Sequence, residues 1–124
     1  MCLFIGNNRI KKCRKDIVCY KILKVCDSQM TRLDYPKSTI HSHIWKIGKK
    51  QDEIKLSVDF YHKAKIINKG YHAYKSLNIA ISELIDSRCS IFKAIIPKGS
   101  DYCISRKGWG NEIVGSNLII KKEL

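Results

Sequence analysis

The segment Pro97-Lys98-Gly99-Ser100 contains the residue types that hold nucleotide phosphates in a phosphate-binding loop. Such a loop needs the order Gly-Lys-Ser/Thr, with another glycine upstream and a helix downstream. In this chain the lysine precedes the glycine, no glycine stands at the required distance upstream, and β-rich residues flank both sides. Proline and glycine are typical of tight turns. We therefore predict a turn between two strands and not a nucleotide site.

A cluster of basic residues lies near the start of the chain. Its members are Arg9, Lys11, Lys12, Arg14 and Lys15. The whole chain has 24 lysines and arginines against 11 acidic residues, and the resulting net charge of +13 attracts polyanions. The alternative interpretation, given equal weight, is that lysines spread along the chain only keep the protein in solution. We predict that this cluster neutralises the phosphates of a partner.

A second set of candidate contact residues comes from two later segments. Its members are Lys49, Lys50, Arg106, Lys107 and Trp109. Trp109 stands between two glycines in the segment SRKGWGNE, which predicts a loop. It either folds back on the core or contacts a planar ligand or partner, because tryptophan and arginine are frequent at binding hot spots.

Histidine and cysteine spacings do not predict a metal site. His41 and His43 share one face of a predicted strand, but no third ligand has a fitting spacing, and we interpret them as surface residues beside Trp45. Six cysteines occur without a Cys-x2-Cys pair, at positions 2, 13, 19, 26, 89 and 103. We expect reduced, buried thiols, no metal, no cofactor and no catalytic residues.

Aromatic residues and histidines gather around a predicted turn at 68–70, interleaved with lysines. The rings are those of Tyr61, His62, Tyr71, His72 and Tyr74, and the lysines are Lys63, Lys65, Lys69 and Lys75. Such a pattern is typical of a surface that stacks bases and contacts phosphates, and also of ordinary strands that bury their rings. We favour core packing, because no ribonucleoprotein-type motif accompanies the pattern.

Hydrophobic periodicity predicts one α+β domain spanning residues 1–124, with a curved, mainly antiparallel sheet. Residues 1–15 are interpreted as a basic arm or a short amphipathic helix, and residues 27–38 as a loop. Expected strands cover residues 16–26, 39–48, 54–61, 71–76, 89–96, 102–104 and 113–122. Residues 54–61 alternate most cleanly, with Ile54, Leu56, Val58 and Phe60 on one predicted core face.

One main helix is expected to cover the sheet, over residues 76–87. Ser76 is a suitable N-cap, and Leu77, Ala80, Ile81, Leu84 and Ile85 form an apolar stripe. The longest apolar runs are far shorter than the roughly 20 residues that span a bilayer. We therefore expect a soluble, cytoplasmic protein without membrane contact.

Three passages resemble motifs of a family of short uncharacterised proteins from bacteria and their mobile elements or phages. They are DIVCYKIL (16–23), GYHAYKS (70–76) and IIPKGSDYCIS with IVGSNLII (95–120). The resemblance brings no known activity and no functional residues. It implies a phage-related role, such as an inhibitor of host defence.

A fainter resemblance is to ADP-ribosyltransferase-like folds, through the order of CYK, YHAYKSLNIAISEL and IFKAIIP. It nominates Tyr20, Lys21, His72 and Glu112 for a nucleotide cleft. Our main prediction remains a small, basic, non-enzymatic module that binds nucleic acid or another polyanionic or acidic partner. An ADP-ribosyltransferase-like enzyme, or a degenerate relative that binds a nucleotide, is the alternative.

Overall fold

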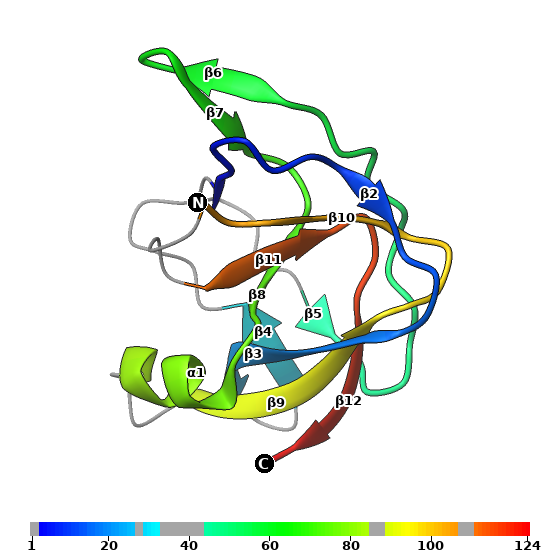
Figure 1. The fold of residues 1–124 in the computed structure, drawn as a ribbon. Coiled ribbons are helices and arrows are strands. Elements are labelled where there is room, and N and C mark those ends of the chain that lie inside the picture. The colour runs from blue at the N-terminus through cyan, green and yellow to red at the C-terminus, as the bar shows by residue number, and fades with distance from the viewer. Residues whose placement is uncertain (1–2, 27–28, 33–43, 85–88, 107–110) are drawn as a thin grey trace.

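The computed structural model describes residues 3–26, 29–32, 44–84, 89–106 and 111–124 (Figure 1). The strands are β1 (Leu3–Phe4), β2 (Lys11–Lys12), β3 (Ile17–Cys26), β4 (Gln29–Arg32), β5 (Ile44–Trp45), β6 (Asp59–Tyr61), β7 (Ala64–Ile67), β8 (Tyr71–Tyr74), β9 (Cys89–Ile96), β10 (Asp101–Ile104), β11 (Glu112–Gly115) and β12 (Ile119–Glu123). Within these ranges, the only helix is α1 (Leu77–Glu83). None of the helical structure in the described ranges is long and apolar enough to cross a membrane.

The strands form two antiparallel sheets. The larger sheet has the order β12-β9-β3-β8-β11-β10-β2, with β4 paired to β3 and β5 paired to β4. The smaller sheet has the order β1-β7-β6. The predicted α+β class with a mainly antiparallel sheet is therefore confirmed for the described residues.

The pair of β3 and β9, which we call the central pair, lies inside the larger sheet between β12 and β8 and has the longest register of the sheet. Its register runs from Ile17 opposite Ile96 to Lys24 opposite Cys89. Both strands are rich in β-branched and aromatic residues, which fit a pleated and buried surface. Leu23 and Phe92 pack from this pair into the main core. The predicted strands at 16–26 and 89–96 are thus confirmed.

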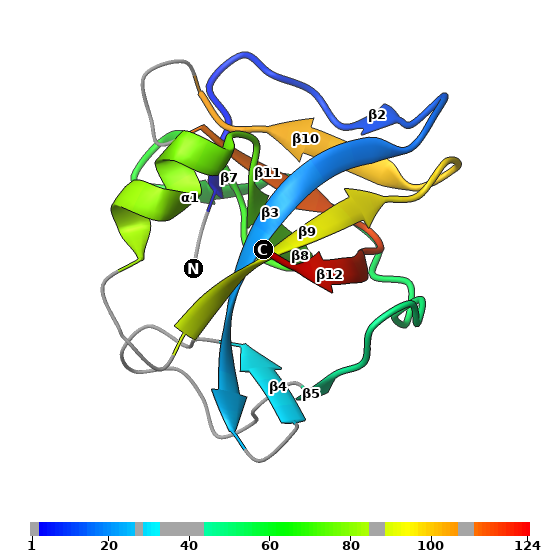
Figure 2. The same ribbon diagram turned by 90° about the horizontal axis from the view of Figure 1, so that it is seen from below.

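The helix is shorter than predicted and covers less of the sheet. Leu84 already has an extended backbone, with φ −80° and ψ 98°, and Ser76 caps α1 without a side-chain hydrogen bond. Of the predicted stripe, Ala80 is buried, whereas Leu77, Ile81 and Leu84 are exposed. Figure 2 shows α1 beside β3. Ala80 packs there with Ile22, Cys89 and Ile91; residues 85–87 of the prediction lie outside the described residues.

The predicted strand at 54–61 is wrong for most of its length, because regular strand structure begins only at Asp59. Leu56 is buried and Ile54 packs against the core, but Val58 and Phe60 are exposed. Before Asp59, single backbone hydrogen bonds replace the continuous hydrogen-bond ladder of a paired strand. The Ile54 amide donates to the Ser116 carbonyl oxygen at 2.9 Å.

Asn117 binds the backbone just before the same segment. Its Oδ1 accepts from the Gln51 amide at 2.9 Å and from the Leu118 amide at 2.8 Å, and its Nδ2 donates to the Gln51 carbonyl oxygen at 2.7 Å. A buried side-chain amide thus satisfies the backbone groups that a partner strand would satisfy in a sheet.

Three further predictions need correction. The segment 113–122 forms two strands, not one, because β11 pairs with β8 and β10 whereas β12 pairs with β9. The predicted loop 27–38 contains β4, which extends the sheet beyond β3. Of the predicted strand 39–48, residues 39–43 lie outside the described residues. In the described remainder, β5 covers only Ile44–Trp45, and a turn follows in which the Lys49 amide donates to the Lys46 carbonyl oxygen at 3.2 Å.

Residues 3–13 pack onto the rest of the protein. β1 pairs with β7 and β2 pairs with β10, and Leu3, Ile5 and Cys13 are buried. The segment predicted as a basic arm or a short helix therefore contributes two short strands, and its Lys11 and Lys12 lie at a sheet edge.

Candidate nucleic-acid interface

The segment Pro97–Ser100 forms the predicted turn, and its backbone amides are bound within the protein. Lys98 donates to Asp16 Oδ1 at 2.8 Å, Gly99 to the Cys13 carbonyl oxygen at 3.0 Å, and Ser100 to the Pro97 carbonyl oxygen at 3.1 Å. Gly99 has a φ of +91°, which favours glycine. These three amides are not open to a phosphate. The flanking strands β9 and β10 do not pair with each other, so the turn is not a hairpin.

The predicted basic cluster lies on and around the edge strand β2, the last strand in the order of the larger sheet. Lys11 is opposite Tyr102 and Lys12 is opposite Asp101 of β10. All five basic residues of the cluster are exposed. Cys13 anchors the end of the strand, because its side chain is buried and its amide donates to the Ser100 carbonyl oxygen at 2.8 Å.

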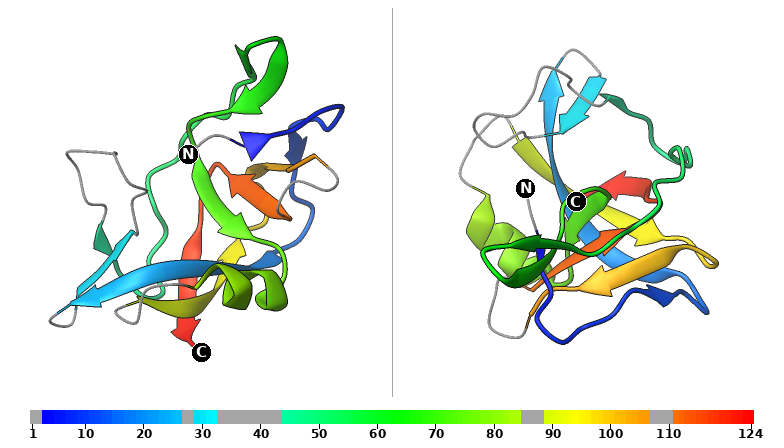
Figure 3. Two further views of the ribbon diagram at one scale, coloured as in Figure 1. Left: turned by 90° about the vertical axis from the view of Figure 1, so that its left-hand side faces the viewer. Right: turned by 90° about the horizontal axis from the view of Figure 1, so that it is seen from above.

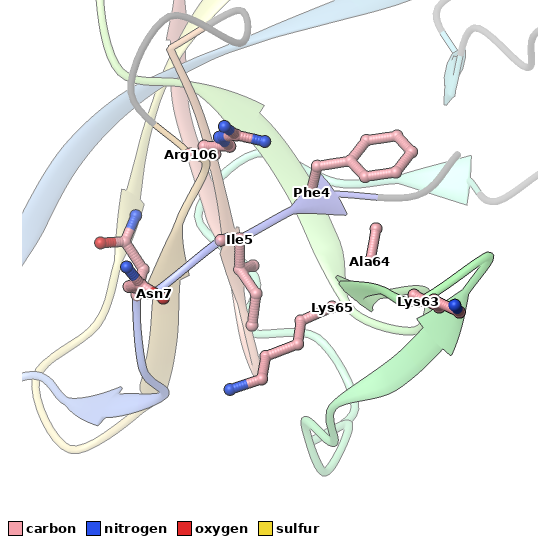
Figure 4. Close-up of a pocket in the computed structure, with 9 residues that line it drawn as sticks. Phe4, Ile5, Asn7, Lys63, Ala64, Lys65 and Arg106 are labelled. Atoms are coloured by element: carbon pink, nitrogen blue, oxygen red, sulfur yellow. The ribbon is translucent and has the colours of Figure 1, made fainter.

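A hollow of about 530 Å³ lies between the N-terminal segment, the start of β7 and the end of β10 (Figure 4). It is lined by Phe4, Ile5, Gly6, Asn7, Asn8, Lys63, Ala64, Lys65 and Arg106. The Arg106 amide donates to the Phe4 carbonyl oxygen at 2.6 Å, and this hydrogen bond holds the Arg106 backbone next to β1. A Cβ atom at Gly6 would lie 3.1 Å from Arg106 Cγ, so the missing side chain lets the arginine approach.

A second hollow of about 210 Å³ adjoins the first. It is lined by Asn7, Asn8, Arg9, Lys11, Tyr102 and Ile104. The two hollows share Asn7 and Asn8. Asn8 is fixed there, because its Nδ2 donates to the carbonyl oxygens of Ile104 and Ser105, both at 2.9 Å.

Basic side chains from three segments that are distant in the sequence therefore line two neighbouring hollows. We call this region the basic face; its residues are Arg9, Lys11, Lys63, Lys65 and Arg106. No aspartate or glutamate is among the described residues that line either hollow. The basic face offers positive charge and the side-chain amides of Asn7 and Asn8, which are suitable groups for phosphate and base contacts.

The structure brings together only part of the predicted contact set. Lys12, Arg14 and Lys15 are exposed next to the basic face, but they do not line the hollows. Lys49 and Lys50 are exposed after the turn that follows β5. Lys107 and Trp109 lie outside the described residues.

Lys12 and Lys50 both lower the pKa of the Glu53 carboxyl group. The pKa of Glu53 lies below its ordinary value, mainly because Ser116 donates a hydrogen bond to it, and Asn117, Lys50 and Lys12 lower it further. Asn117 Nδ2 is 3.1 Å from Glu53 Oε2. The charge of these two lysines is therefore partly balanced within the protein.

Sequence reasoning missed Asn7, Asn8 and Tyr102, and it placed Lys63 and Lys65 in a different cluster. Lys63 and Lys65 come near the N-terminal segment through the pairing of β1 with β7, in which Leu3 is opposite Ile67 and Phe4 is opposite Ile66. The interleaving of Lys63 and Lys65 with aromatic residues was the only available signal, and it did not reveal the pairing.

The predicted cluster of aromatic residues and histidines is split in two. Tyr71 and His72 of β8 are buried, as the core interpretation predicts. The Tyr71 hydroxyl donates to the Asp52 carbonyl oxygen at 2.7 Å, and the ring packs edge-on against Trp45 with centroids 5.6 Å apart. Tyr61 and His62 are instead exposed at the end of β6, where the core interpretation is wrong.

Tyr20, Lys21, His72 and Glu112 lie on the neighbouring strands β3, β8 and β11. Lys21 is buried, and its Nζ donates to the His72 carbonyl oxygen and lies 5.7 Å from the centroid of the Trp45 ring. Tyr20 points to the opposite face of β3, where it packs against the cluster beneath α1. Burial raises the pKa of Glu112, Glu83 adds to this effect, and Lys21 opposes it.

The described part of the chain contains no group of three or more histidine, cysteine, aspartate or glutamate side chains placed to hold a metal ion. His41 and His43 lie outside that part. Cys13, Cys19, Cys89 and Cys103 are buried free thiols. Burial raises the pKa of the Cys19 thiol to about 12, so it stays protonated at neutral pH.

In comparisons of the chain with known proteins, no family, no curated protein and no solved structure matches it.

Proposed function

We propose that this protein is a binding module that engages nucleic acid through the basic face. The observation that supports the proposal is the convergence of Arg9, Lys11, Lys63, Lys65 and Arg106 on two neighbouring hollows that share Asn7 and Asn8. Lysine and arginine neutralise phosphates, and the release of counterions from nucleic acid then drives binding. No catalytic step is assigned to these residues.

The side chains of the basic face would contact nucleic acid in different ways. Arg106 offers a planar guanidinium, which binds a phosphate through two hydrogen bonds and also stacks on a base. The lysines act as point charges that position the phosphate chain. Tyr102, directly opposite Lys11, places a phenol ring beside the smaller hollow. The exposed cluster at 9–15 extends the positive surface along β2.

The proposal is tested by fluorescence anisotropy with labelled single-stranded and duplex DNA at two salt concentrations. In one variant Arg9, Lys11, Lys12, Arg14 and Lys15 are all changed to serine. We expect its affinity to fall and its dependence on salt to weaken. The slope of log affinity against log salt concentration should become shallower by roughly 0.7 to 0.9 for each phosphate contact removed.

A matched variant removes the same number of charges elsewhere. Lys55, Lys69, Lys75, Lys121 and Lys122 are exposed and line neither hollow, and they are changed to serine together. We expect this variant to retain most of the affinity. An equal loss in both variants would show that only net charge matters and would contradict the basic face. A protein partner recovered after nuclease treatment, without any binding to DNA, would instead favour an acidic partner and an inhibitory role.

A further inference from the structure

The hairpin of β6 and β7 projects from the molecule (Figures 1 and 3). β6 is one of the two edge strands of the smaller sheet. It carries two large rings on its surface, since Phe60 is 68% exposed and Tyr61 is 56% exposed. An exposed phenylalanine beside an exposed tyrosine differs from the rings of the core, where Phe92 and Trp45 are almost completely buried. The hairpin thus presents apolar, planar surface to a partner.

The turn of this hairpin is strained. His62 and Lys63 have φ values of 47° and 68°, the left-handed conformation that a two-residue hairpin turn usually gives to Asn-Gly. A residue with a side chain is destabilised there by about 1–2 kcal/mol. The turn places the His62 ring edge-on against Tyr61, with centroids 4.4 Å apart, and brings Lys63 to the larger hollow. Strain of this kind is frequent at binding sites.

The register distributes rings and charges over both faces of the hairpin. Phe60 is directly opposite Lys65, so these two side chains share one face. Tyr61 is opposite Ala64 and shares the other face. Lys63 and Lys65 also line the hollow that contains Arg106. Phe60 is therefore beside a cation that can hold the phosphate next to a stacked base, whereas the Tyr61 ring packs edge-on against His62, the residue before Lys63.

We infer that the β6–β7 hairpin is a stacking surface for single-stranded nucleic acid, with bases on Phe60 and Tyr61 and phosphates on Lys63, Lys65 and Arg106. This inference rests on the proposed function and specifies its ligand. A single strand fits better than a duplex, because its bases expose the ring faces that stack on aromatic side chains. In a duplex those faces are covered by neighbouring base pairs.

The test measures binding of an oligothymidine and of a duplex of equal length by anisotropy. In the variant Phe60→Ala with Tyr61→Ala, the charges remain and both rings are lost. We expect the affinity for oligothymidine to fall roughly tenfold for each ring, with an unchanged salt slope and a much smaller effect on the duplex. The variant Phe60→Tyr with Tyr61→Phe keeps two rings and should restore binding.

A matched control removes exposed apolar side chains from α1, by Leu77→Ala with Ile81→Ala, and should leave binding unchanged. Circular dichroism verifies that each variant is folded. Unchanged oligothymidine binding by the ring-less variant would overturn the inference, whereas loss of binding in the serine variant of Arg9–Lys15 would still support the basic face. Equal losses for oligothymidine and duplex would also overturn it, and failure of the unmodified protein to bind any DNA would overturn both proposals.

Discussion

The central pair β3–β9 and the hairpin β6–β7 use similar residue types in opposite ways. In the central pair, Phe92 is 1% exposed, and the chain leaves β9 through a turn with glycine at its positive φ. In the hairpin, Phe60 is 68% exposed, and the positive φ values fall on His62 and Lys63. At these positions the central pair follows the rules of burial and turn chemistry, and the hairpin departs from both.

The residues that depart from these rules lie in the hairpin that contributes Lys63 and Lys65 to the basic face. Local rules of residue choice are broken most often where a protein binds something, because a side chain needed for contact is kept despite its effect on stability. The hairpin breaks two such rules within four residues and lines the larger hollow. At the positions compared, the central pair breaks neither rule, and its buried Lys21 donates a hydrogen bond to the His72 carbonyl oxygen.

The largest expected difference is between the same substitution in the two regions. Phe92→Ala should lower the free energy of unfolding by about 3–5 kcal/mol, because it removes a buried ring and leaves a cavity. Phe60→Ala should change it by no more than about 0.5 kcal/mol, because the ring is already in water. Urea denaturation measures both values. A large loss in Phe60→Ala would mean that the ring is covered in solution.

Alkaline pH should weaken the central pair through Cys19. Burial raises the pKa of this thiol from 9.0 to about 12, so the folded state keeps a proton that the unfolded state releases. The stabilisation is complete below pH 9 and is lost as the pH rises toward 12. Urea midpoints between pH 8 and pH 11 should fall less steeply in Cys19→Ala. A parallel decline in both proteins would assign the alkaline loss to other groups.

The smallest effects are expected at the two turns, and they should have opposite signs. Lys63→Gly should stabilise the protein by about 0.5–1 kcal/mol, because glycine adopts the positive φ without strain. Gly99→Ala should destabilise it by about 1 kcal/mol, although the space around Gly99 is open, because φ is +91°. Thermal unfolding compares the two. The stabilised variant should also bind DNA more weakly, because it loses the charge of Lys63, one of the proposed phosphate contacts.

The fold was predictable where residue pattern and strand pairing agree. The runs at 16–26 and 89–96 are β-rich throughout, and both became long strands. The alternation from Ile54 to Phe60 was as clear, yet it produced no strand before Asp59. The alternation correctly placed Leu56 in the core but not Val58 and Phe60, and a strand also needs a partner for its amides. Ser116 and Asn117 supplied single partners here, and no sequence pattern in residues 54–60 reveals them.

The candidate site was predictable only in part, for a similar reason. Charge density located Arg9 and Lys11, because local composition is visible in a sequence. The proximity of Lys63 and Arg106 to them depends on the pairing of β1 with β7 and on the backbone contact between Phe4 and Arg106. Such long-range contacts follow from the topology of the whole sheet and leave no local signature.

The register of the central pair also determines when this protein can fold. Ile17 pairs with Ile96 and Lys24 with Cys89, so the full register of β3 with β9 can form only after residue 96 has been synthesised. Pairing between such distant segments is slow, and exposed β-rich segments are prone to aggregation while they wait. The run IVCYKILKVC would be such a segment during synthesis, and Lys21 and Lys24 interrupt it with charge. Charges within an apolar strand hinder association between nascent chains.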